Sequence, residues 1–133
     1  MKKKDFFNEN GYWIEKNLFT NSEMEEMFTL FYDTFLTLFE KFNVPSKNNY
    51  PKAENVNLIN DIKLLDSLIL ECFNYNKNII GEGYDIVSYS SIFLRFLSNK
   101  NQELITKELL GAIPSDTLYG WTNRVRIDPP QDE

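Results

Sequence analysis

A long amphipathic helix constrains the fold of this chain more than any other feature. Apolar residues recur at helical spacing from Met24 to Phe42, which gives one broad apolar face over about five turns. Either Thr20 or Ser22 could open this helix with a capping box, because each is followed three residues later by a glutamate. Pro45 ends it, since proline cannot continue the hydrogen-bond ladder. Such a face must be covered by other elements, and an apolar share of 42% is ample for a packed core.

The other predicted elements are shorter than this helix. They are a strand at Tyr12–Lys16, an internal loop at residues 44–57, helices near Asn60–Asn76, Ser91–Leu97 and Gln102–Leu110, and a last strand at Thr117–Ile127. The stretch Gly81-Glu82-Gly83 is interpreted as a turn, because it lacks the third glycine and the lysine of a phosphate-binding loop. Gly111 is expected to cap the last helix in the left-handed conformation. With 133 residues, the chain is a single domain, 1–133, or the N-terminal part of one.

Charge and cysteine content limit the partners and the cellular location that can be expected. A net charge of −6 argues against nucleic acid as a partner, because phosphates favour a basic surface. No apolar run approaches membrane-spanning length, so no membrane partner is expected. Cys72 is the only cysteine and has apolar neighbours, which predicts a buried structural thiol and a reducing, cytoplasmic location. The acidic pairs Glu25-Glu26 and Asp61 with Asp66 are interpreted as solvated helix faces.

The last predicted strand has two chemically different faces. Its apolar face carries Tyr119, Trp121, Val125 and Ile127, with Asn123 among them, and its polar face carries Thr122, Arg124 and Arg126. Arginines on one strand face can hold a carboxylate through paired hydrogen bonds, which makes these three polar residues candidates for binding a cosubstrate or substrate. The alternative is an edge strand that shows its charges to water and so discourages aggregation.

Both ends of the chain resemble phytanoyl-CoA dioxygenase-like proteins. The stretch NGYWIEKNLF from Asn10 to Phe19, followed by the capped helix start, is similar to the strand and long helix that open this family. The stretches ELLG, ending at Gly111, and NRVRIDPP, ending at Pro130, resemble the family's helix end and a strand that closes on proline. The middle of the chain, about 44–97, has no matching motif.

This resemblance implies an α+β fold: a helix-rich N-terminal layer plus the first strands of a double-stranded β-helix, or jelly roll, left incomplete. The complete family enzyme uses Fe(II) and 2-oxoglutarate, with iron held by two histidines and one carboxylate. This chain contains no histidine and ends at Glu133, before the family's first ligand. Asp128 also departs from the basic residue that often precedes the proline. No catalytic residue, metal ligand or cofactor is therefore assigned to the chain itself.

Two functions follow as hypotheses. In the first, the chain is the N-terminal segment of an Fe(II)/2-oxoglutarate-dependent dioxygenase that hydroxylates a small organic substrate when complete, and it is inactive alone. Its partner would then be the missing C-terminal barrel part, or it would self-associate, because the apolar face of the last strand has no evident cover. In the second, the chain is a small α-rich protein-interaction module without enzymatic activity.

Overall fold

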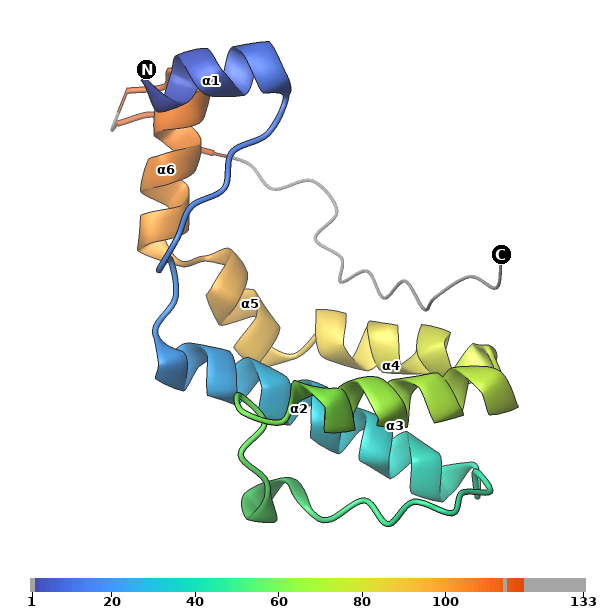
Figure 1. The fold of residues 1–133 in the computed structure, drawn as a ribbon. Coiled ribbons are helices and arrows are strands. Elements are labelled where there is room, and N and C mark those ends of the chain that lie inside the picture. The colour runs from blue at the N-terminus through green and yellow to red at the C-terminus, as the bar shows by residue number, and fades with distance from the viewer. Residues whose placement is uncertain (1, 114, 119–133) are drawn as a thin grey trace.

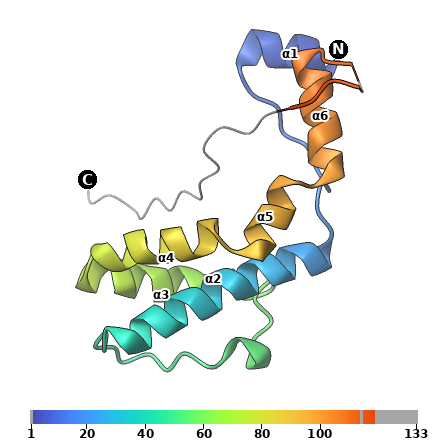
Figure 2. The same cartoon turned by 180° about the vertical axis from the view of Figure 1, so that it is seen from behind.

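Helices form all the regular secondary structure in the residues that this computed structural model describes, 2–113 and 115–118. In chain order they are α1 (Lys3–Asn10), α2 (Asn21–Lys41), the short 3-10 helix η1 (Ala53–Asn55), α3 (Ile62–Tyr75), α4 (Asn78–Ser88), α5 (Ser91–Leu97) and α6 (Lys100–Leu110). Helices α2, α3 and α4 lie side by side as a bundle (Figure 1, and Figure 2 from behind). Helix α5 turns away from the bundle, and α6 carries the chain to a position against α1.

The predicted α+β fold is wrong for the described residues, which are all-α. Tyr12–Lys16 has strand-favouring side chains but forms an irregular connection. A strand needs a partner that completes its backbone hydrogen bonds, and the described part of the chain contains no second strand. Side-chain contacts hold the connection instead: Trp13 Nε1 donates a hydrogen bond of 2.7 Å to Glu15 Oε2. The other predicted strand, Thr117–Ile127, lies outside the described residues except for its first two, which are irregular.

Helix α2 begins after Thr20, one of the two starts that the sequence allows. Thr20 Oγ1 accepts a hydrogen bond of 3.2 Å from the Glu23 backbone N–H, and the Thr20 N–H donates one of 2.7 Å to Glu23 Oε2. This reciprocal pair satisfies backbone donors that the first turn would otherwise leave without partners. The bond from the Thr20 N–H also lowers the pKa of Glu23, because it stabilises the carboxylate. Ser22 lies within the first turn and does not cap the helix.

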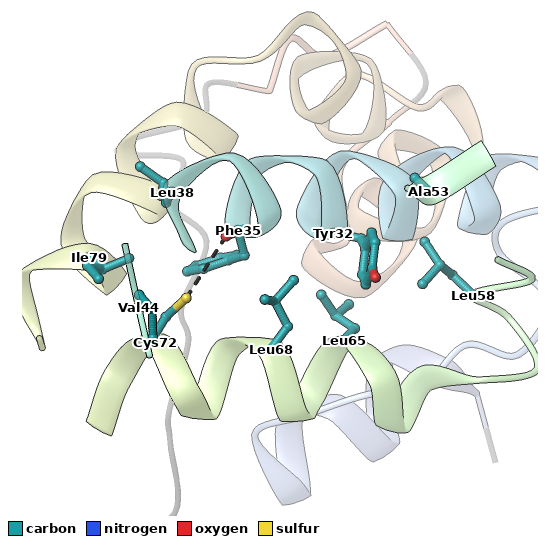
Figure 3. Close-up of a cluster of buried hydrophobic side chains, with 10 residues drawn as sticks. All are labelled: Tyr32, Phe35, Leu38, Val44, Ala53, Leu58, Leu65, Leu68, Cys72 and Ile79. Atoms are coloured by element: carbon teal, nitrogen blue, oxygen red, sulfur yellow. Dashed lines mark hydrogen bonds between the residues drawn. The ribbon is translucent and has the colours of Figure 1, made fainter. Parts of the chain in front are cut away.

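The core lies between α2 and α3, with additions from α4 and from the connection between α2 and α3 (Figure 3). Its fully or nearly fully buried members are Tyr32, Phe35 and Leu38 of α2, Leu65, Leu68 and Cys72 of α3, Ile79 of α4, and Val44, Ala53 and Leu58. Each aliphatic side chain removed from water here contributes about 1.5–3 kcal/mol. Cys72 is fully buried, as predicted, and its thiol donates to the Phe35 carbonyl oxygen at 3.9 Å.

Helix α4 runs through both Gly81 and Gly83, so the predicted turn at these residues is wrong. A Cβ atom on Gly83 would stand only 2.5 Å from Cζ of Phe35 on α2. The aromatic ring therefore occupies the space that a side chain at residue 83 would need. This glycine allows α2 and α4 to approach each other closely and does not mark a chain reversal.

The connection between α2 and α3 runs back along α2 before α3 begins (Figure 1). The Tyr32 hydroxyl donates a hydrogen bond of 2.8 Å to the Pro51 carbonyl oxygen, and Ala53 of η1 is buried in the core. These two contacts place η1 beside the middle of α2.

Helices α1 and α6, with the connection from Gly11 to Phe19, form a second unit that we call the α1–α6 lobe. Lys3 Nζ links its parts, at 2.9 Å from Glu15 Oε2 and 3.8 Å from Glu108 Oε2. Every buried hydrophobic residue of the described chain belongs to the bundle and its connections, and none to this lobe. Exposed large apolar side chains are frequent in the lobe and just after α6: Tyr12, Ile14, Leu104, Leu110 and Ile113.

Candidate functional site

The site residues predicted from the sequence, Thr122, Arg124 and Arg126, lie outside the described residues. Their assignment to cosubstrate or substrate binding therefore stays a prediction. The structure instead draws attention to the bundle, where helix α2 carries two different faces.

One face of α2 forms the wall of a groove with a volume of about 740 Å³. The opposite wall comes from η1 and its neighbours, and Ile92 of α5 closes one part of it. On α2 the lining residues follow a single helical stripe with spacings of three and four residues: Ser22, Glu25, Glu26, Thr29, Leu30, Asp33 and Thr34. The stripe from Ser22 to Thr34 extends for about 18 Å at the helical rise of about 1.5 Å per residue.

The groove is acidic. Three of its carboxylates, those of Glu25, Glu26 and Asp33, come from α2, and a fourth, that of Glu54, comes from η1. Among the residues that the structure describes, Lys52 is the single basic one that lines it. Its apolar surface is formed by Leu30, Ala53, Val56 and Ile92. A lining that combines several like charges with an apolar surface suits a ligand of opposite charge that also carries apolar groups.

Asp33 has a perturbed carboxyl group in the groove. The residue remains exposed on one side, but partial burial of its carboxyl raises the pKa, and the negative charge of Glu54 raises it further. A carboxyl with a raised pKa, beside a second carboxylate in a groove, marks a candidate functional position. Fixing η1 beside α2 therefore has an electrostatic cost, which a positively charged ligand would relieve.

Thr34 adds a polar group to the lining of the groove. Its side chain lines the groove although the residue is only 8% exposed. In a helix, a threonine hydroxyl often donates to the carbonyl four residues earlier, as Thr106 does to Gln102 at 2.8 Å. Thr34 forms no such bond to any described residue. A hydroxyl with free hydrogen-bonding capacity thus lies next to Asp33.

One ion pair is already present at the edge of the groove. Arg95 of α5 donates through Nη2 to Glu26 Oε1, and both side chains are largely exposed. The sequence interpretation of Glu25-Glu26 as a solvated face agrees with their exposure, but it overlooked that they share a stripe with Asp33. Asp33 itself had a signal in the sequence, because it is the one charged residue between Met27 and Phe39.

Other chemistry receives no support from the described residues. Within 2–113 and 115–118, no group of three or more cysteine, aspartate or glutamate side chains is placed to hold a metal ion. The thiol of Cys72 lies in the core, where burial raises its pKa to about 11 and keeps it protonated at neutral pH. The groove itself offers carboxylates, a threonine side chain and apolar surface to a ligand.

No protein-family model, curated protein or solved structure gives a significant match to the chain. The resemblance to phytanoyl-CoA dioxygenase-like proteins accordingly stays a prediction from a few short stretches. None of the described helices is long and apolar enough to cross a membrane.

Proposed function

We propose that this chain is an α-helical protein-interaction module and that its groove binds a positively charged segment of a partner protein. The observation that carries the proposal is the composition of the groove, whose described lining combines four carboxylates and one lysine with an apolar surface. Charge complementarity favours a cationic partner, and the apolar surface favours a polypeptide segment with apolar side chains over a simple ion.

The length of the groove also supports a polypeptide ligand. A stripe of about 18 Å accommodates five or six residues of an extended segment at about 3.3 Å per residue. Side chains of an extended segment alternate in direction, so basic residues could face the carboxylates while apolar residues face Leu30 and Val56. The function thus needs neither a nucleophile nor a metal ion.

Binding of defined peptides tests this function. The probe is a fluorescein-labelled peptide of about six residues that alternates leucine and arginine, long enough to span the groove. Its counterpart replaces every arginine with glutamate and keeps the leucines. Fluorescence anisotropy should show the cationic peptide binding at least about tenfold more tightly, because several exposed ion pairs of about 0.2–1 kcal/mol each add to such a ratio.

Added salt should weaken the binding of the cationic peptide, since exposed charges are screened. The control protein is Asp66→Asn, which removes an exposed carboxylate on α3 that does not line the groove. This variant should bind the cationic peptide as the unaltered chain does. Equal binding of the cationic and anionic peptides, or no binding of either, would overturn the proposed function.

A further inference from the structure

Three hydrogen-bonding groups from two elements converge on one stretch of the groove. Asp33 and Thr34 come from α2, and Glu54 comes from η1 on the opposite wall. The carboxylates of Asp33 and Glu54 are close enough for the charge of Glu54 to act on Asp33. Thr34 follows Asp33 on the helix, and the residue is 8% exposed; its side chain lines the groove and forms no hydrogen bond to a described residue.

We propose that this stretch is an arginine subsite, in which one guanidinium of the bound segment lies between Asp33 and Glu54 and donates a hydrogen bond to Thr34. The inference rests on the proposed function, because it names the side chain by which the groove would recognise its partner. Arginine fits better than lysine for a geometric reason. A guanidinium presents five N–H donors in a planar fork and can serve acceptors on two elements at once, whereas an ammonium is a compact, strongly hydrated point charge.

The surroundings of the subsite suit the rest of an arginine side chain. Leu30, Ala53 and Val56 supply apolar surface along which the methylene stem can lie while its charged end reaches the carboxylates. The chain also provides an example at the edge of the groove. Arg95 pairs with Glu26, whereas Lys52, which lines the groove, forms no ion pair with a described residue.

Arginine binding should depend on pH through Asp33. Burial and the charge of Glu54 raise the pKa of Asp33 in the free groove, and a bound guanidinium would lower it again. At pH values near this raised pKa, binding of the guanidinium therefore releases a proton from Asp33. The affinity for arginine should accordingly rise as the pH rises through the raised pKa of Asp33. The other charged groups of the groove are Glu25 and Glu26 of α2, Lys52 and Glu54 near η1, and Arg95 of α5. The variant Asp33→Asn separates the contribution of Asp33 from theirs.

The test combines three peptides with four variants of the whole chain. The peptides are the leucine–arginine probe and two counterparts in which lysine or the neutral isostere citrulline replaces each arginine. The variants are Asp33→Asn, Glu54→Gln, Thr34→Val and the control Asp66→Asn. We expect the unaltered chain to prefer the arginine probe to the lysine peptide by about threefold, and to bind the citrulline peptide most weakly.

Both Asp33→Asn and Glu54→Gln should lower the affinity for the arginine probe about fivefold and abolish its advantage over the lysine peptide. Thr34→Val, which keeps the size of the side chain, should lower the affinity for the arginine probe about twofold. The rise in affinity with pH should be smaller in Asp33→Asn than in the unaltered chain. Loss of the arginine preference is the decisive result, because a general loss of negative charge would weaken the arginine and lysine peptides alike.

Failure of this inference can be told apart from failure of the proposed function. If the cationic peptides bind but Asp33→Asn and Glu54→Gln behave like Asp66→Asn, the subsite is wrong and the function stands. If the unaltered chain binds no cationic peptide, both the arginine subsite and the proposed function are wrong. A third result would overturn the arginine subsite and assign the stretch to a metal ion: displacement of the probe by MgCl₂ or CaCl₂ that far exceeds its displacement by NaCl at the same ionic strength.

Discussion

The aromatic ring of Phe35 on α2 lies directly over Gly83 on α4, so that a Cβ atom at residue 83 would stand 2.5 Å from Cζ of the ring. Phe35 is fully buried, and its backbone carbonyl accepts the hydrogen bond from the Cys72 thiol of α3. One residue of α2 thus contacts both neighbouring helices. Its ring cannot move aside without disturbing the core.

Gly83→Ala should therefore destabilise the protein. The added methyl group must displace the buried ring, which typically costs about 1–3 kcal/mol, and this outweighs the gain of about 0.8 kcal/mol in helix propensity. Urea unfolding followed by circular dichroism measures the change in free energy.

Gly81→Ala is the matched control for this prediction. Gly81 lies in the same helix, but a Cβ atom there would have no neighbour within 4 Å. The same substitution should stabilise the protein by about 0.8 kcal/mol, because only the helix propensity changes. Equal effects of the two substitutions would show that the Phe35 contact does not explain Gly83.

These two glycines illustrate why part of the fold could be predicted from the sequence and part could not. The periodic apolar residues of α2 and the left-handed cap at Gly111 are local patterns, and both are present in the structure. The role of Gly83 depends on a ring 48 positions earlier in the chain, which no local pattern reveals. The strand predicted at Tyr12–Lys16 failed for a related reason, because a strand exists only with its partner.

The same distinction applies to the groove. The stripe of α2 that carries Asp33 could be traced on a helical projection, and its single charge within an apolar run was a usable signal. Glu54 could not be assigned to the site, because its position depends on the return of the α2–α3 connection along α2. The Tyr32 to Pro51 hydrogen bond that helps to fix this return joins residues 19 positions apart.

Thr20→Ala should destabilise the protein by about 1 kcal/mol, since it removes the side-chain oxygen that caps α2. Ser22→Ala is the control, because Ser22 was the alternative cap in the sequence but lies inside the helix. Its effect should be within about 0.5 kcal/mol. Thermal unfolding of both variants measures the difference, and a larger loss for Ser22→Ala would mean that the helix begins later.

Cys72 should resist thiol reagents in the folded protein. Burial raises its pKa to about 11, against 9.0 for an unperturbed thiol, and removes it from solvent. Ellman's reagent should give no rapid reaction at neutral pH and one thiol per chain after unfolding in urea. Because Cys72 is the only cysteine, any thiol that reacts must belong to it. A fast reaction of the native protein would show that the α2–α3 contact opens readily.

The raised pKa of Cys72 also sets a pH dependence of stability. The folded state retains the thiol proton more strongly than the unfolded state. The contribution of this proton to the free energy of unfolding is therefore present in full below pH 9.0 and is lost as the pH rises through about 11. Cys72→Ala should lose less stability over this range than the unaltered chain. Identical losses would assign the alkaline destabilisation to other groups.

Asp33→Asn should make the protein more stable while it weakens peptide binding. Burial and Glu54 raise the pKa of Asp33 above 3.8, so this group favours the folded state at low pH and loses that contribution as the pH rises through its raised pKa. At neutral pH the ionised carboxylate therefore costs stability, and the neutral amide removes that cost with nearly the same helix propensity. The melting temperature should rise at neutral pH and change little in acid, whereas Asp66→Asn should leave both unchanged. A residue that destabilises the free protein but strengthens ligand binding is the signature of a functional position. Unchanged or lower stability of Asp33→Asn at neutral pH would remove that signature from Asp33.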